Sequence, residues 1–329
     1  MQQLARRSLD LMFFPSFDGF WRRRLRGKVL CLQYNRVDEP GQFPFLDRFG
    51  SAPIPPGDLL RELSFLASQG ARFLTLSDLR RGRFPGPGEF GVVVCFDQGF
   101  RSNYSAGLGV IEWLSAKGVL FQASGMVDAP SLIWEHTLYW LADDPDRAEV
   151  LQQLAHGRLP ASRPHTGDAL VAHLSGAEPM ATVEELLAEA IAKIGAGAGE
   201  RLAELAQTLY PSAAYLKAAR ANRHEIASQG HHHYPRQAID AETFEQELIR
   251  SQQELEAIVA RKPQAFAYPF NNYGPGDAEL AGRHYYQAAT MEARPITADT
   301  PRLALPRCRW PGPFPNNRQR RRWLLTGHI

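Results

Sequence analysis

The most informative stretch of the sequence is GVVVCFDQGF, residues 91–100 of a chain of 329 residues. Its apolar first half predicts a buried strand, and this strand brings one carboxylate, Asp97, to its carboxyl end. A glutamine, Gln98, and a glycine follow. Proteins that alternate strands and helices place catalytic groups at this edge of a sheet or barrel, so Asp97 is the first candidate site residue.

The segments around this strand alternate in the same way. Apolar runs predict strands at residues 28–35, 72–76 and 119–124, and leucines or other apolar residues at helical spacing predict helices at 57–70 and 102–118. Such alternation favours a mainly parallel sheet or barrel covered by helices. From about residue 129 to 222 every pattern is helical, and strands resume after residue 223.

We therefore expect one α/β barrel that is interrupted by an all-helical insertion. The predicted parts are an N-terminal basic and aromatic segment (1–27), the first part of the barrel (28–128), the insertion (129–222), the second part of the barrel (223–310) and a basic C-terminal tail (311–329). The insertion is a reasonable subunit contact if the protein forms oligomers.

Composition indicates an ordinary globular protein. The chain is 44% hydrophobic and 22% charged, with a formal net charge of +2, which gives no reason to expect nucleic acid as a partner. The three cysteines lie in apolar contexts without CxxC spacing, so we expect buried thiols in a reducing compartment. No apolar run reaches the roughly 18 residues of a membrane span, and the N-terminus lacks the order of a secretion signal. We expect a cytoplasmic protein.

Both ends of the chain carry basic runs, RRRLR at 22–26 and RQRRR at 318–322. We interpret these runs as solvated ends. The arginines and aromatic residues of segment 1–27 also suit weak contact with an anionic membrane surface, although packing on the domain itself is the preferred interpretation.

Five sequence blocks in order resemble the polysaccharide deacetylase (NodB-homology) superfamily, also called carbohydrate esterase family four. CLQYNRVDEPG resembles its L-x-Y-H-x-V strand, VVVCFDQGFRSNY its T-F-D-D-G-Y-x-x-N block, and HEIASQGHHHYP its H-E-I-x-S-H-G-x-x-H block. KPQAFAYPFNNYG and AATMEARPITADTPRLALPR resemble the later blocks. The resemblance spans residues 28–309 apart from the insertion, and it implies a distorted (β/α)7-type barrel and metal-dependent hydrolysis of an acyl amide on an amino sugar.

The metal ligands of this family are altered here. By resemblance, Asp97 matches the general base, whereas Gln98 matches the acidic ligand, Gln229 the first histidine ligand and His233 the second. A hydrolytic metal lowers the pKa of bound water from 15.7 to about 7, and neutral amides bind zinc poorly. We therefore expect no cofactor, and a hydrogen-bonded arrangement in which the amides of Gln98 and Gln229 reach one another and Asp97.

Two other features bear on the site. His231 and His233 would face the same side of an extended segment and could form a rebuilt zinc site, although loop histidines are the simpler interpretation. The resemblance places Tyr268, Pro269, Phe270, Asn271 and Asn272 beside Asp97, where aromatic faces and amides suit a sugar ring, although Tyr268 and Phe270 could equally be barrel packing.

Three functions stay open from the sequence. The first is a metal-free or catalytically reduced amide hydrolase that uses Asp97 and His233 on an acylated amino sugar or glycan precursor. The second is a non-catalytic protein that binds a glycan or a partner. The third is a metal-dependent deacetylase rebuilt around His231 and His233.

Reversion of both glutamines tests the residue mapping. Gln98→Asp combined with Gln229→His recreates the ligand set of the family, so the double variant is expected to bind about one zinc per chain, measured by elemental analysis of protein purified without a histidine tag. The unchanged protein treated in the same way is the control. A double variant without bound zinc would contradict the mapping.

Overall fold

The computed structural model describes residues 18–50 and 52–327. Its strands are β1 (Val29–Tyr34), β2 (Ala71–Leu74), β3 (Phe90–Phe96), β4 (Val119–Gln122), β5 (Glu225–Ser228), β6 (Ala265–Ala267), β7 (Gln287–Thr290), β8 (Leu305–Pro306) and β9 (Cys308–Arg309). All paired strands run parallel, in the order β8-β7-β6-β5-β4-β3-β1-β9, while β2 pairs with the first half of β3. These eight ordered strands form a nearly closed barrel, so the predicted fold class is confirmed.

A single short stretch, Leu305–Arg309, closes the barrel. Its first residues, β8, pair with β7, and its last residues, β9, pair with β1. Arg307 lies between these two short strands. The two strands at the ends of the order, β8 and β9, are thus consecutive in the chain and separated only by Arg307. The Arg307 side chain therefore lies where the barrel closes.

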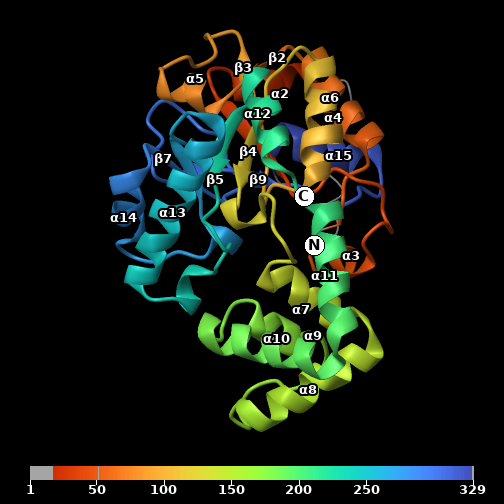
Figure 1. The fold of residues 1–329 in the computed structure, drawn as a ribbon. Coiled ribbons are helices and arrows are strands. Elements are labelled where there is room, and N and C mark those ends of the chain that lie inside the picture. Colours follow the sequence, from red (N-terminus) through yellow and green to blue (C-terminus); the bar gives the residue numbers. More distant parts are fainter. Residues whose placement is uncertain (1–17, 51, 328–329) are drawn as a thin grey trace.

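Helices cover the outside of the barrel (Figure 1). They are α2 (Asp18–Leu25), α3 (Pro44–Phe49), α4 (Pro56–Ser68), α5 (Leu76–Arg80), α6 (Leu108–Trp113), α13 (Ala241–Val259), α14 (Asp277–His284) and α15 (Asn317–Thr326). None of the helices in the described part of the chain is long and apolar enough to cross a lipid bilayer.

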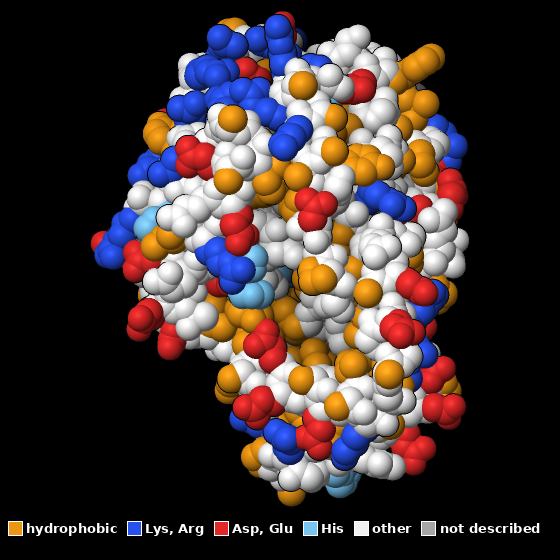
Figure 2. Space-filling view, in the orientation of Figure 1, with side chains coloured by type: hydrophobic (Ala, Val, Ile, Leu, Met, Phe, Trp, Pro, Cys, Tyr) orange, Lys and Arg blue, Asp and Glu red, His pale blue; other side chains and the backbone are white. Residues whose placement is uncertain are grey.

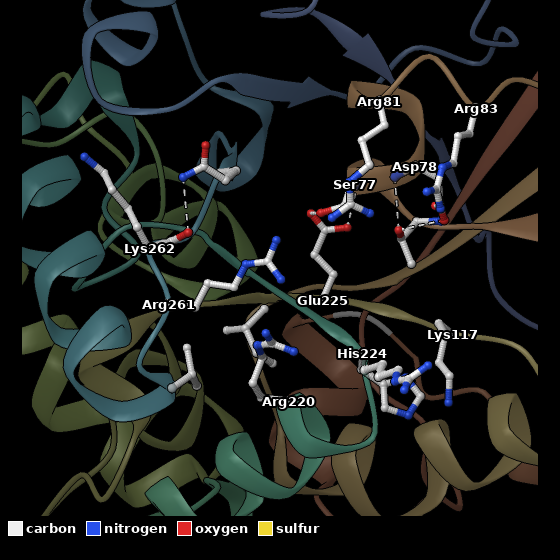
Figure 3. A pocket seen from close by; sticks show the side chains of 15 residues that line it. Ser77, Asp78, Arg81, Arg83, Lys117, Arg220, His224, Glu225, Arg261 and Lys262 are labelled. Carbon is white, nitrogen blue, oxygen red and sulfur yellow. Dashed lines mark hydrogen bonds and ion pairs between the residues drawn. The ribbon is translucent and has the colours of Figure 1, made fainter.

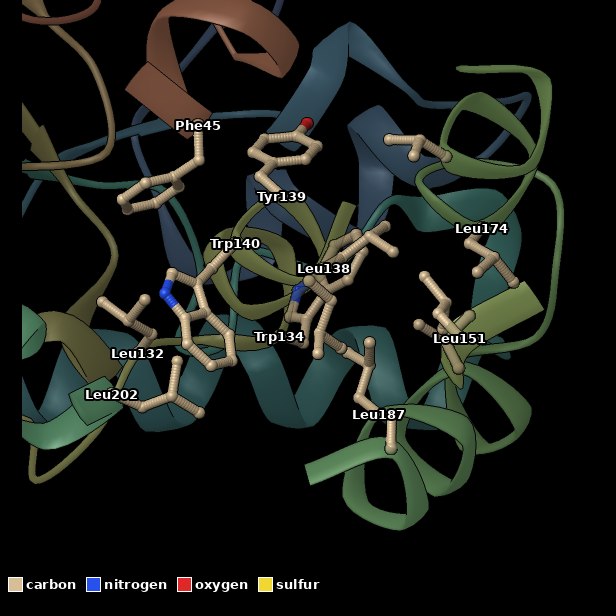
Figure 4. Close-up of a cluster of buried hydrophobic side chains, with 14 of the residues drawn as sticks. Phe45, Leu132, Trp134, Leu138, Tyr139, Trp140, Leu151, Leu174, Leu187 and Leu202 are labelled. Atoms are coloured by element: carbon tan, nitrogen blue, oxygen red, sulfur yellow. The ribbon is translucent and has the colours of Figure 1, made fainter. Parts of the chain in front are cut away.

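The chain between β4 and β5 contains helices and no strand. These helices are α7 (Trp134–Asp143), α8 (Pro145–Arg158), α9 (Gly167–Leu174), α10 (Met180–Ile194), α11 (Ala196–Leu209) and α12 (Ala213–Ala221). The first five pack together below the barrel on a cluster that includes Trp134, Leu138, Trp140, Leu151 and Leu187 and that continues into Phe45 of α3 (Figures 1 and 4). By contrast, α12 packs against β5 and α13 of the barrel.

The C-terminal segment is part of the barrel's outer layer. Its basic run was expected to be a solvated end, but it lies on α15, in which Trp323, Leu324 and Leu325 are buried. The aromatic ring of Trp323 packs edge-on against Tyr34 of β1. Burial of these three apolar residues holds α15, and with it the arginines, against the domain. Of the N-terminal segment, residues 1–17 lie outside the described residues, and Leu25 of α2 is buried.

Strand alternation separates two faces of the barrel. Val93, Cys95, Phe121, Ala227 and Ala267 share one apolar cluster inside it. Their neighbours in the sequence, such as Val92, Val94 and Leu120, join the cluster under the outer helices. Because side chains on a strand alternate, Asp97, Gln229 and Arg307 continue the inner face beyond Cys95, Ala227 and Leu305. The three polar groups therefore converge at the carboxyl end of the barrel.

The backbone conformation at the end of α13 can be tested by substitution. Ala260 follows the helix with φ 50° and ψ 33°, a left-handed conformation that favours glycine. Ala260→Gly is expected to raise the free energy of unfolding by about 1 kcal/mol in urea denaturation. The same change at exposed Ala257, inside the helix, should lower it by about 1 kcal/mol. Destabilisation by both substitutions would contradict this interpretation.

Candidate functional site

A buried ion pair lies at the centre of the candidate site. Asp97 is 4% exposed, and its Oδ1 accepts a hydrogen bond of 2.5 Å from Nη1 of Arg307. The Arg307 guanidinium also lies over the ring of Phe121, at 4.7 Å from the centroid. Burial by itself would lower the pKa of Arg307, but the charge of Asp97 and its hydrogen bond to Arg307 raise that pKa above its ordinary value. Arg307 is therefore a fixed positive charge at the barrel's carboxyl end.

Gln229 connects Asp97 to Gln98. Its Nε2 donates to Asp97 Oδ2 at 3.2 Å, and its Oε1 accepts a 2.6 Å hydrogen bond from the backbone N–H of Gln98. The amide of Gln229 thus reaches Asp97 as expected. With Arg307 on one oxygen and Gln229 on the other, both oxygens of Asp97 have a donor.

The side chain of Gln98 has a different partner from the one expected. Its Nε2 donates to Glu135 Oε2 at 3.0 Å, so the Gln98 side chain contacts α7 of the insertion instead of the Gln229 amide. Gly99 makes the turn after Gln98, with φ 94°, and a Cβ there would lie 2.0 Å from Oε1 of Gln122. Only glycine can adopt this positive φ and also leave room for the Gln122 side chain.

Glu135 was missed by the sequence analysis. It is 3% exposed, and besides Gln98 it accepts hydrogen bonds from His233 Nδ1 at 2.8 Å and from the hydroxyl of Tyr139 at 3.1 Å. Burial would raise the pKa of Glu135, but the His233 charge and hydrogen bond outweigh it and lower the pKa. The only available signal was an acid within the apolar helical run WEHTLYW.

His233 has one satisfied and one unsatisfied ring nitrogen. An ionised Glu135 can only accept, so Nδ1 carries a hydrogen, and in the neutral form of the imidazole the lone pair is therefore on Nε2. Nε2 is buried and has no hydrogen-bond partner among the described residues. The ring of Phe270 packs against the imidazole with centroids 4.8 Å apart. His233 is thus oriented by a carboxylate and keeps a free basic nitrogen.

These groups surround one cavity of about 540 Å³. Its lining comprises Asn35, Phe49, Gly50, Asp97, Gln98, Glu135, Tyr139, Gln229, His233, Tyr268, Phe270, Asn271, Met291, Arg307 and Arg309. Arg307 is the last residue of the block AATMEARPITADTPRLALPR, so its position, although not its contacts, was visible in the sequence, whereas Arg309 lies two residues beyond that block. Tyr139 of α7 also lines the cavity.

The predicted sugar-binding residues divide into two groups. Tyr268, Phe270 and Asn271 line the cavity, whereas Pro269 and Asn272 do not, and Asn272 accepts a hydrogen bond from the backbone of Gln237. The ring of Tyr268 packs with Phe244, Phe266 and Tyr273 under the outer helices. Barrel packing therefore accounts for most of Tyr268, and Phe270, which is 40% exposed, is the available aromatic face.

Strained backbone is concentrated at the cavity. Eight described residues other than glycine have a positive φ, and four of them line the cavity, namely Gln98 (63°), His233 (61°), Phe270 (56°) and Asn271 (56°). Such conformations cost on the order of 1 kcal/mol or more each and persist where the surrounding structure enforces them. Their clustering identifies this cavity as the candidate functional site.

The residues present do not fit a catalytic zinc ion. Asp97 is engaged by Arg307 and Gln229, and Glu135 by three donors, so His233 Nε2 is the one unengaged strong ligand atom among the residues discussed. His231 does not line this cavity, and its Nδ1 lies 2.6 Å from Glu254 and 2.9 Å from the Ser124 hydroxyl. Within residues 18–50 and 52–327, no three His, Cys, Asp or Glu side chains form a group suited to a metal.

The ion pair can be tested by a double-mutant cycle. Arg307→Met leaves Asp97 buried without its counter-charge and is expected to lower the free energy of unfolding by about 3–5 kcal/mol in urea denaturation. Adding Asp97→Asn removes the unpaired charge, so the double variant should be more stable than Arg307→Met alone. Simple additivity of the two single substitutions would show that the groups are not coupled.

Comparison with known proteins agrees with this architecture. Residues 185–289 match the family model of polysaccharide deacetylase, whereas no curated protein sequence matches significantly. A polysaccharide deacetylase from Bacillus cereus superposes with a TM-score of 0.57 at 15% identity, covering 92% of this chain and 70% of that one.

Two further solved structures are similar. A Streptococcus pyogenes deacetylase, PplD, in complex with acetate gives a TM-score of 0.57 at 13% identity, over 87% of this chain and 93% of that chain. IcaB from Ammonifex degensii gives 0.56 at 15% identity, over 91% and 98%. The resemblance inferred from the motifs is confirmed to this extent: residues 185–289 match the polysaccharide deacetylase family model, and the chain has the NodB-like barrel fold of the solved deacetylases.

Proposed function

We propose that this protein hydrolyses the acyl amide of an N-acylated amino sugar or glycan precursor without a bound metal, and that His233 is the general base. The observation that carries the proposal is the pair formed by Glu135 and His233, in which the carboxylate holds Nδ1 and leaves Nε2 free. The deacetylase family supports an acetylated glycan as the substrate class.

The chemistry requires one base and one water molecule. His233 Nε2 accepts a proton from water while the water oxygen attacks the carbonyl carbon of the amide. The proton then passes from His233 to the leaving nitrogen as the C–N bond breaks, and the products are a carboxylic acid and an amine. Such proton transfer contributes on the order of 100- to 10,000-fold to the rate. Glu135 is a positioning residue that stabilises the imidazolium formed during the reaction.

Asp97 has a different role in this proposal. Because both of its oxygens already accept hydrogen bonds, it is less available than His233 to take a proton. Its charge instead orients Arg307 and the Gln229 amide at the base of the cavity. Phe270 offers an exposed aromatic face next to His233, which suits stacking on a sugar ring.

A non-catalytic glycan-binding protein is the second candidate. The occupied oxygens of Asp97 favour it, since the residue that matches the general base of the family is engaged by Arg307 and Gln229. Both candidates bind the glycan in the same cavity, but only the hydrolase releases the acyl group.

The test is acetate release from penta-N-acetylchitopentaose by protein dialysed against EDTA. Turnover is expected to survive the chelator, and His233→Gln should reduce kcat about 100-fold or more. Glu135→Gln should reduce kcat and shift its pH profile, because the neutral amide no longer stabilises the imidazolium. His232→Gln is the matched control, since His232 pairs with Glu247 outside the cavity.

Other outcomes would replace the proposal. Loss of turnover in EDTA with recovery on adding zinc would support a metal-dependent deacetylase. Absence of turnover combined with a raised Tm in the presence of the oligosaccharide would support the binding protein.

A further inference from the structure

A second cavity lies at the opposite end of the barrel from Asp97. It has a volume of about 440 Å³ and is formed by α5 and by the loops that lead into β3, β4, β5 and β6. These loops precede the strands, whereas Asp97 follows one, so the two cavities are at the amino and carboxyl ends of the same barrel. Figure 2 shows Lys and Arg side chains gathered at the end of the molecule where α5 lies.

The walls of this amino-end pocket are strongly basic. Seven of its lining residues are cations, namely Arg81, Arg83, Lys117, Arg220, Arg223, Arg261 and Lys262. Only two lining residues are carboxylates, Asp78 and Glu225. The whole chain carries a formal net charge of only +2, so this is a local concentration of positive charge.

The carboxylates of the pocket are largely engaged elsewhere. Asp78 caps α5 and lies 3.5 Å from Arg83, and Glu225 accepts hydrogen bonds of 2.9 Å from the backbone and hydroxyl of Ser77. For the other six cations, no carboxylate of the described residues lies within ion-pair distance. Like charges that line one pocket repel one another, and a bound anion would relieve that repulsion.

The side chain of Arg220 independently indicates that the pocket binds an anion. Its Nε is buried and has no hydrogen-bond partner in the described part of the chain. Figure 3 shows Arg220, from the last turn of α12, and Arg261, from the loop before β6, extending into the same part of the pocket, near Glu225. A buried guanidinium N–H without an acceptor is costly, and an oxygen of a bound anion would satisfy it.

We propose that the amino-end pocket binds a ligand that carries two linked phosphate groups. Guanidinium groups donate paired hydrogen bonds to phosphate oxygens, which favours phosphate at a site rich in arginine. The cations come from several separate loops around the cavity, so one phosphate group contacts only part of them, whereas a diphosphate reaches cations on more than one wall. This site is independent of the chemistry at Asp97 and His233.

The test uses inorganic pyrophosphate as the probe, with the full chain in a phosphate-free buffer of low ionic strength. Isothermal titration should show saturable binding of pyrophosphate that is tighter than binding of orthophosphate. Arg220→Gln combined with Arg261→Gln should weaken pyrophosphate binding at least tenfold. The matched control is Arg201→Gln with Arg283→Gln, which removes the same charge from exposed helix positions outside the pocket.

Circular dichroism of both double variants verifies that they are folded before titration. Saturable binding of ADP as well as pyrophosphate supports a site with room for an organic group, and binding of pyrophosphate alone supports a site for free diphosphate. The proposal is overturned if pyrophosphate does not bind saturably, if orthophosphate binds equally well, or if the control variant loses as much affinity as the pocket variant.

Discussion

The buried ion pair between Asp97 and Arg307 determines the arrangement of the carboxyl end of this barrel. It joins the end of the central strand β3 to the stretch that closes the barrel between β7 and β1. Two charges removed from water are tolerated only when they compensate one another and have further hydrogen bonds, which Gln229 supplies to Asp97. The same contacts leave Asp97 with no oxygen free of a donor.

Compared with the family motif, the site lacks one acidic residue and contains another one from a different part of the chain. The neutral Gln98 stands where the family motif has an acid, but Glu135 brings a carboxylate back from α7 and contacts both Gln98 and His233. The insertion is therefore part of the site. Its apolar core, in which Trp134 and Leu138 lie on the same helix as Glu135, gives that helix a rigid support (Figure 4).

The two ends of the barrel differ in their electrostatics. At the carboxyl end, buried acids are matched with Arg307 and His233, which suits the acid–base chemistry that we propose. At the amino end, most cations lack a carboxylate partner, which suits an anion. One barrel thus presents two chemically distinct cavities, and a substitution in one need not disturb the other.

Local sequence determined the strands, their faces and the residues at their ends. The apolar run before Asp97 and the order of the motif blocks were sufficient to predict the barrel, and they also indicated that Asp97, Gln98 and Gln229 lie together at its carboxyl end. The partners of these residues were not predictable in the same way. Glu135 lies 37 residues from Gln98, and Arg307 lies 210 residues from Asp97.

Periodicity determines which face of a strand or helix a side chain occupies, because this depends only on neighbouring backbone angles. Which groups meet across that face depends on how the barrel closes and where the insertion docks. The tertiary structure alone therefore decided that Gln98 bonds to Glu135, that His233 keeps one nitrogen free, and that loops far apart in the chain bring their arginines to one pocket.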